Sequence, residues 1–210
     1  MRIISHRGWW LNPSEHNTPA AFVRSFSAGY GTETDLRDHG GRLVVAHDPA
    51  GPGAFSFEEF LRLHKAHDQS LPLALNIKAD GLVPLLAERL RAHDVPDYFC
   101  FDMSVPETRR YAAAGLRFFT RQSEIEPAPA FLDQAEGVWM DSFDRDWITH
   151  EAISAHLREG RRVCLVSPEL HRRDPADFWR FLREFPDLSS PRLLVCTDLV
   201  EETLNQLKTS

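Results

Sequence analysis

The chain has 210 residues, a length that fits one domain with a sizeable core. Its hydrophobic fraction of 42% and charged fraction of 26% are ordinary for a globular protein, and its net charge of −7 argues against a nucleic-acid-binding protein. No apolar run approaches the ~18 residues of a membrane span. We therefore expect a single domain over residues 1–210, with no nucleic-acid partner and no integral membrane segment.

Cysteine usage and the N-terminal residues predict a reducing compartment. Cys100, Cys164 and Cys196 each lie in a strand-like run, and an odd number of cysteines does not make a disulfide framework. Met1 and Arg2 lead directly into a strand, without an apolar leader. We expect a cytoplasmic protein with buried free thiols, and the pattern makes no prediction about its oligomeric state.

In the first third of the chain, short apolar runs alternate with amphipathic segments. The pattern predicts a strand over residues 2–6, a helix over 19–28, a strand that holds Glu33 and Asp35, a strand over 42–46 and a helix over 57–67. Thr18 is a good N-cap, and Ser56 forms a capping box with Glu59, so both helices have clear starts. The strands on either side of Gly40 and Gly41 are expected to form a hairpin.

The loop of this hairpin has two possible lengths. A two-residue loop would set His47 opposite Thr34, on the face away from the carboxylates. A three-residue loop over residues 39–41, with one glycine in the left-handed conformation, would set His47 opposite Glu33. We favour the three-residue loop, because it brings His47 to the carboxylates.

The rest of the chain continues the alternation. Strands are expected over residues 73–78, 98–102, 116–120, 137–140, 162–166 and 193–196, and helices over 82–90, 105–115, 129–135, 149–159, 175–182 and 200–207. With the hairpin set aside, eight strands alternate with helices, which fits either a barrel or an open doubly wound sheet. Ionisable residues follow many strands, and this favours a (β/α)₈ TIM barrel with a β-hairpin excursion after strand 2, because barrels carry their active sites at the carboxyl ends of strands.

Residues 5–48 carry a set of side chains suited to phosphodiester chemistry. Glu33 and Asp35 lie two apart in a strand and so point to the same face, where two carboxylates suit Mg²⁺ or Ca²⁺. Arg7 can bind a phosphoryl group. His6 and His47, each at a strand end, can move protons near neutral pH. This set predicts a phosphodiesterase that uses one divalent cation.

These motifs resemble those of the glycerophosphodiester phosphodiesterase family, within the phospholipase-C-like TIM barrels. The resemblance rests on His6-Arg7-Gly8, on Asn17-Thr18 with Phe22, on Glu33-x-Asp35 and on His47-Asp48, and continues more loosely through Leu75–Lys78 and Cys196–Asp198. It implies hydrolysis of glycerophosphodiesters to glycerol phosphate and an alcohol, in lipid metabolism. It also implies that a hydroxyl neighbouring the phosphate attacks first and gives a cyclic phosphate.

The resemblance extends to a third metal ligand and a phosphate-binding lysine. Lys78 stands where the family has its lysine, whereas Asn76 replaces the family's third metal-binding carboxylate. Asn76 can still bind a hard cation through its amide oxygen. Only residues 49–55 separate the His-Asp pair from the next helix, so the family's inserted subdomain is missing and a more open pocket is expected.

The function expected from the sequence is therefore a metal-dependent phosphodiesterase. His6 and His47 are the general acid and base, Arg7 and Lys78 bind the substrate phosphate, and Glu33, Asp35 and Asn76 hold one Mg²⁺ or Ca²⁺. The substrate is a small phosphodiester. Two alternatives stay open, a phospholipase-D-like enzyme that stops at a cyclic phosphate and a barrel that binds phosphorylated ligands without turnover.

Several other polar residues are expected outside the chemistry. Asp141 is expected to cap the loop after its strand, and Asp198 to bond the backbone at the exit of the last strand. Some histidines share no spacing and are expected on the surface, namely His64, His67, His93, His150, His156 and His171.

Overall fold

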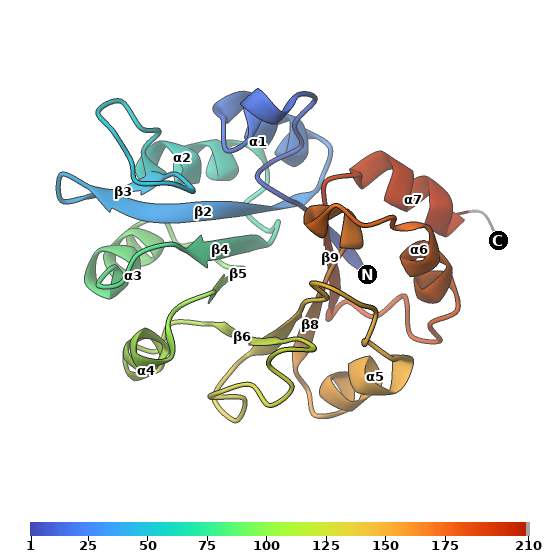
Figure 1. Ribbon diagram of the computed structural model, residues 1–210. Coiled ribbons are helices and arrows are strands. Elements are labelled where there is room, and N and C mark those ends of the chain that lie inside the picture. The colour runs from blue at the N-terminus through green and yellow to red at the C-terminus, as the bar shows by residue number, and fades with distance from the viewer. Residues whose placement is uncertain (209–210) are drawn as a thin grey trace.

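Nine strands and seven α-helices alternate in the computed structural model, which describes residues 1–208 (Figure 1). The strands are β1 (Arg2–Ser5), β2 (Gly31–His39), β3 (Arg42–Val45), β4 (Leu73–Ile77), β5 (Tyr98–Phe101), β6 (Phe119–Gln122), β7 (Gly137–Met140), β8 (Arg162–Val166) and β9 (Leu193–Thr197). The helices are α1 (Pro19–Ser27), α2 (Phe57–His67), α3 (Val83–Ala92), α4 (Val105–Ala113), α5 (His150–Arg158), α6 (Ala176–Arg183) and α7 (Val200–Lys208), with 3₁₀ turns η1 (Pro13–Glu15) and η2 (Pro168–His171).

Eight of the strands form a parallel barrel. Their order is β5-β4-β2-β1-β9-β8-β7-β6, and β3 pairs antiparallel with β2 outside this path. The two end strands meet through a bridge between Cys100 and Phe118, where the Cys100 amide donates to the Arg117 carbonyl at 2.9 Å. The barrel is thus nearly closed, and the predicted TIM barrel with its hairpin excursion is confirmed over the open sheet.

Aromatic rings fill the barrel lumen. Phe99 stacks on Phe119 with ring centroids 3.7 Å apart, and Phe101 stacks on Trp139 at 3.9 Å. Side chains alternate along each strand, so the residue two positions beyond a lumen-facing one points into the mouth above the packed rings. This alternation carries His6, Asp141 and Asp198 to the mouth, two residues after the lumen side chains of their strands.

The helices surround the barrel and bury its outer face (Figure 1). Side-chain N-caps fix several helix starts, including the predicted caps Thr18 and Ser56. Thr18, Ser56, Ser104 and Thr149 each accept a hydrogen bond from a backbone N–H of the first turn. Such caps satisfy amide groups that the helix itself leaves unpaired, which explains why these boundaries could be predicted from the sequence.

The hairpin differs from the prediction. His39 pairs with Arg42, so the loop is the two residues Gly40 and Gly41, and the three-residue loop was wrong. Both glycines have positive φ, 56° and 75°, which is the requirement of a two-residue turn whose twist matches the strands. Two adjacent glycines meet this requirement without strain, so the shorter loop forms.

Three further predictions needed correction. Residues 129–135 form turns rather than a helix, and the Thr120 hydroxyl donates to the Ala130 carbonyl at 2.6 Å within this segment. His64 and His156 are buried rather than exposed. Burial is tolerated because Nε2 of His64 is paired with the Leu71 carbonyl and Nε2 of His156 with the side-chain amide oxygen of Gln122. The three cysteines are buried and free, as predicted. Within residues 1–208, no helix is long and apolar enough to cross a membrane.

Candidate active site

Glu33 and Asp35 lie in the part of β2 that pairs with β4 in the barrel, before the strand extends into the hairpin, and they point into the mouth of the barrel. Both are almost fully buried, 1% and 0% exposed. Burial, together with the charge of Asp35, raises the pKa of Glu33 to about 7. Asn76 stands beside Asp35 in the β2–β4 register. The prediction that the two carboxylates share one face is confirmed.

Two cations and an amide hold Asp35. Arg7 Nε lies 3.1 Å from Asp35 Oδ2, Lys78 Nζ lies 3.4 Å from Oδ1, and Asn17 Nδ2 donates to Oδ2 at 2.8 Å. Arg7 and Asn17 both have φ near +57°, a backbone conformation that costs free energy in residues other than glycine. The strained backbone at Arg7 and Asn17 coincides with the contacts that both side chains make with the Asp35 carboxylate.

His6 is oriented by a carboxylate from the opposite end of the chain. Its Nδ1 lies 2.9 Å from Asp198 Oδ1, which also accepts from Trp10 Nε1 at 3.1 Å, and its Nε2 lies 3.9 Å from Glu33 Oε2. Burial lowers the pKa of His6, but the Asp198 hydrogen bond and the Glu33 charge outweigh it and raise the pKa above its ordinary value. The Asp198 carboxylate thus bonds an imidazole and an indole, and the prediction that it bonds the backbone was wrong.

His47 lies apart from these side chains. Its side chain is 46% exposed, its Nδ1 is 2.9 Å from Asp48 Oδ1, and its carbonyl accepts from Arg37 Nε at 2.8 Å. In the part of the chain that the structure describes, no hydrogen bond or ion pair joins His47 to Glu33. The structure thus brings together six of the seven predicted site residues and leaves His47 at the edge.

The structure also adds residues that the sequence analysis did not select. Asp102 pairs with Arg121 and lies 3.9 Å from Lys78 Nζ. Asp141 Oδ1 lies 2.6 Å from His171 Nε2 and also accepts the Ser142 amide, so Asp141 caps its loop as predicted and holds a histidine as well. The only signal for these residues was the position of Asp102 and Asp141 after their strands. Arg121 and His171 carried none.

Together these residues line the carboxyl end of the barrel, and we call them the mouth ring. Neighbours contact each other through the pairs above, through Arg7 N donating to Glu33 Oε2, through Glu169 accepting the Asp198 amide, or through Phe143, which lies between Arg121 and His171. Among the described residues, Glu169 and His171 are joined only through the backbone of η2. The members are His6, Arg7, Glu33, Asp35, Lys78, Asp102, Arg121, Asp141, Phe143, Glu169, His171 and Asp198.

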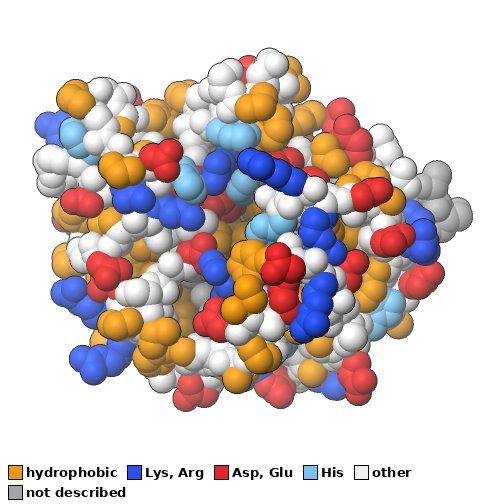
Figure 2. All heavy atoms as spheres, in the orientation of Figure 1, with side chains coloured by type: hydrophobic (Ala, Val, Ile, Leu, Met, Phe, Trp, Pro, Cys, Tyr) orange, Lys and Arg blue, Asp and Glu red, His pale blue; other side chains and the backbone are white. Residues whose placement is uncertain are grey.

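The mouth ring carries an excess of negative charge. It has six carboxylates, three permanent cations and two histidines, so its formal charge is −3 with ionised carboxylates and neutral histidines. Figure 2 shows acidic, basic and histidine side chains gathered around the centre of the face that Figure 1 presents. A phosphodiester, itself an anion, would bind poorly here unless further positive charge were supplied.

The oxygens around Asp35 fit a divalent cation. Asp35 Oδ1 and Asn76 Oδ1 are both buried and make no hydrogen bond within the described part of the chain, and Asp35 Oδ1 has only the ion pair with Lys78 at 3.4 Å, so both oxygens have room for a further cationic partner. Within residues 1–208 no cluster of three or more His, Cys, Asp or Glu side chains could hold a metal. A site here would therefore have to use the amide oxygen of Asn76 with the two carboxylates, a set of hard oxygen donors.

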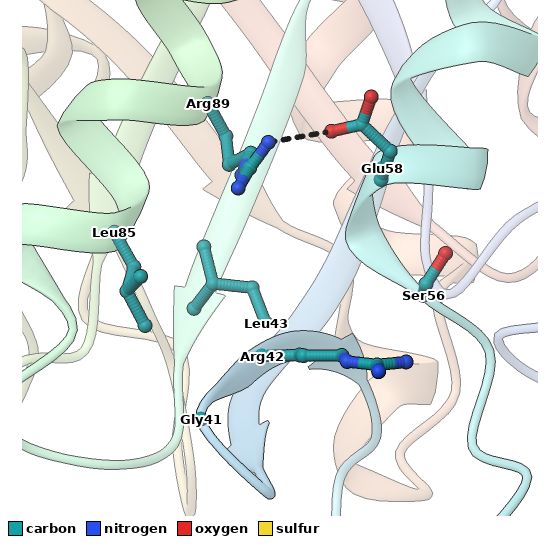
Figure 3. Close-up of a pocket in the computed structure, with 7 residues that line it drawn as sticks. All are labelled: Gly41, Arg42, Leu43, Ser56, Glu58, Leu85 and Arg89. Carbon is teal, nitrogen blue, oxygen red and sulfur yellow. Dashed lines mark hydrogen bonds and ion pairs between the residues drawn. The ribbon is translucent and has the colours of Figure 1, made fainter.

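Other cavities lack such chemistry. A cavity of about 330 Å³ lies under the hairpin, where Glu58 is held by Arg89 at 3.4 Å (Figure 3). Arg62 and His93 also pair with this carboxylate, so it has no free reactive group. A smaller cavity of about 130 Å³ adjoins the mouth ring at Asp102 and Arg121, between β5 and β6. Of these two cavities, the second could extend a site at the mouth.

No family model and no curated protein matches the chain. Among solved structures, glycerophosphodiester phosphodiesterase from Agrobacterium tumefaciens is 18% identical with a TM-score of 0.65, over 94% of this chain and 96% of that one. A glycerophosphoryl diester phosphodiesterase from Parabacteroides distasonis is 13% identical with a TM-score of 0.69, over 99% and 86%.

A third structure of the same fold is a phospholipase. The Ca²⁺-dependent phosphatidylinositol-specific phospholipase C from Streptomyces antibioticus is 13% identical to this chain, with a TM-score of 0.56 over 99% of this chain and 96% of that one. Identities this low show a shared fold and do not by themselves carry an activity across. The chain thus has the TIM-barrel fold that these phosphodiesterases and this phospholipase C share.

Proposed function

We propose that the protein is a metal-dependent phosphodiesterase that hydrolyses glycerophosphodiesters to glycerol phosphate and an alcohol. The observation that carries the proposal is the mouth ring, in which a carboxylate-oriented histidine, two cationic side chains and a pair of buried carboxylates meet at the carboxyl end of a barrel. Solved structures of the same fold include enzymes of this class.

Each residue then has a defined task. Arg7 and Lys78 bind the phosphoryl oxygens, because their cationic groups already lie together at Asp35. Glu33, Asp35 and Asn76 would hold one Mg²⁺ or Ca²⁺, which supplies positive charge for the phosphoryl oxygens. His6, held by Asp198, exchanges a proton with a reacting oxygen. The reaction needs a second proton-transfer group, for which the sequence points to His47.

Product analysis tests the proposal. Phosphorus NMR of glycerophosphocholine incubated with the protein and Ca²⁺ or Mg²⁺ is expected to show free glycerol phosphate, and an excess of chelator is expected to stop its formation. A cyclic phosphate as the final product would instead support the phospholipase-D-like alternative. No turnover of any glycerophosphodiester would refute the proposal and leave a ligand-binding barrel.

A matched pair of variants ties the activity to the site. His6→Ala is expected to lower kcat by about 10²- to 10⁴-fold, the usual cost of losing a general acid or base. His67→Ala, at an exposed histidine of α2, is expected to leave kcat unchanged. Full activity of the His6 variant would place the chemistry elsewhere.

A further inference from the structure

A second imidazole in the mouth ring is oriented by a carboxylate in the same way as His6. His171 ends η2, and its Nε2 lies 2.6 Å from Oδ1 of Asp141, which is only 4% exposed. The same oxygen accepts the Ser142 amide at 3.0 Å. One carboxylate oxygen of Asp141 thus accepts both the Ser142 amide and the Nε2–H of the ring, which holds the imidazole in one orientation.

The other ring nitrogen of His171 is free to react. With Nε2–H donated to Asp141, Nδ1 carries either a lone pair or a second proton, depending on the charge of the ring. No residue among 1–208 makes a hydrogen bond to Nδ1, and the side chain is 25% exposed. The ring also rests against Phe143, with centroids 4.9 Å apart, which fixes its plane.

The support of His171 is continuous with that of His6. Glu169, two residues earlier in η2, accepts the Thr197 hydroxyl at 2.6 Å and the Asp198 amide at 3.0 Å. Asp198 is the residue that orients His6. Because η2 is bound to the end of β9 in this way, the two carboxylate–imidazole pairs belong to one fixed rim of the barrel.

His47 has a carboxylate partner but lacks the burial and the tertiary contacts that hold His171. Its carboxylate partner, Asp48, is its own neighbour in the chain and is 89% exposed, so the pair is weak and does not fix the ring. Its side chain is nearly half exposed and contacts no member of the mouth ring by hydrogen bond or ion pair within the described residues. A proton donor needs a ring held in one orientation, and of these two imidazoles His171 is the one held by a buried carboxylate.

We propose that His171, held by Asp141, is the proton donor to the departing alcohol in the phosphodiesterase reaction. As the bond between phosphorus and the alcohol oxygen breaks, its electron pair stays on that oxygen, which takes the Nδ1 proton of the imidazolium and leaves as a neutral alcohol. The attacking oxygen forms the new bond to phosphorus and loses its own proton to His6. His171 becomes neutral, keeps its bond to Asp141 and regains a proton from water.

The chemistry of the leaving group distinguishes a proton donor at position 171 from a residue that only supports the fold. The experiment rests on the proposed function and compares glycerophosphocholine with the diester in which p-nitrophenol replaces choline. An alkoxide needs a proton to leave, whereas p-nitrophenolate leaves without one. The substitution His171→Gln keeps an amide N–H where Nε2 contacts Asp141 but removes the donor at Nδ1, so we expect the fold to survive, as circular dichroism would verify.

We expect His171→Gln to lower kcat for glycerophosphocholine by about 10²- to 10⁴-fold and for the nitrophenyl diester by less than about 10-fold. Asp141→Asn, which frees the ring, is expected to show the same substrate dependence at smaller size, and gives a second reading should the glutamine variant misfold. His47→Gln is expected to affect both substrates equally. His67→Gln, at an exposed histidine outside the mouth ring, is the unchanged control.

Three results would overturn the role of His171 while leaving the wild-type activity in place. The His171 and Asp141 variants could lose equal activity on both substrates, or neither variant could lose activity. The substrate-dependent loss of kcat could also appear in His47→Gln instead. A wild-type protein that hydrolyses neither diester would refute the proposed function itself, and the role of His171 with it.

Discussion

Replacement of Glu33 by glutamine is expected to stabilise the metal-free protein at alkaline pH. Glu33 is 1% exposed, and burial next to the charge of Asp35 raises its pKa from 4.5 to about 7. In the unfolded chain the carboxyl group keeps its ordinary pKa. The difference of about 2.5 pKa units corresponds to about 3 kcal/mol of destabilisation once the group is ionised.

The direction with pH follows from which state holds the proton. Below about pH 4.5, Glu33 is protonated in both states and costs nothing. As the pH rises towards 7, the unfolded chain releases this proton while the folded protein retains it, so the free energy of unfolding falls. Above about pH 7 the loss is complete. A glutamine does not titrate, and its amide oxygen can still accept the Arg7 amide that now donates to Glu33 at 3.1 Å.

Urea denaturation followed by circular dichroism, in excess chelator from pH 4.5 to 8, tests this reasoning. We expect Glu33→Gln to match the wild type near pH 4.5 and to exceed its free energy of unfolding by up to about 3 kcal/mol at pH 8. Added Ca²⁺ should narrow the gap at pH 8 by stabilising the wild type alone. If the difference in the free energy of unfolding between the variant and the wild type does not change with pH, the conclusion that burial and the Asp35 charge raise the pKa of Glu33 is refuted.

Three further changes test separate parts of the structure. Asn76→Asp adds a negative charge beside the oxygens that make no hydrogen bond. Calorimetric titration should show tighter Ca²⁺ binding by on the order of 1 kcal/mol. Equal affinities would mean that position 76 does not face the ion. Asp198→Asn removes the carboxylate that raises the pKa of His6, so an NMR titration in chelator should find a lower His6 pKa; an unchanged value would contradict the positioning role. Phe99→Ala empties the lumen against Phe119 and should cost about 3–5 kcal/mol in urea denaturation, and a loss under about 1 kcal/mol would mean that the lumen is loosely packed.

Local sequence patterns predicted most of the strands and helices, and within the site they predicted that Glu33 and Asp35 lie together. Local signals carry this information, since a strand alternates its side chains and a helix starts at a residue that caps its first amides. Glu33 and Asp35 had to share a face because they lie two positions apart in one strand, with only Thr34 between them. Thr18 and Ser56 had to cap, because their hydroxyls accept N–H groups a few residues away.

The tertiary structure decided which distant side chains meet. His6 and Asp198 lie 192 residues apart in sequence and 2.9 Å apart in space, and His171 meets Asp141 across a strand and a 3₁₀ turn. No local period predicts such pairs, since they exist only after the strands close into a barrel and bring their carboxyl ends to one rim. The place of His47 was decided in the same way, by the hairpin register that two adjacent glycines select. Local rules therefore identified the strand ends, while barrel closure selected which of them form the site.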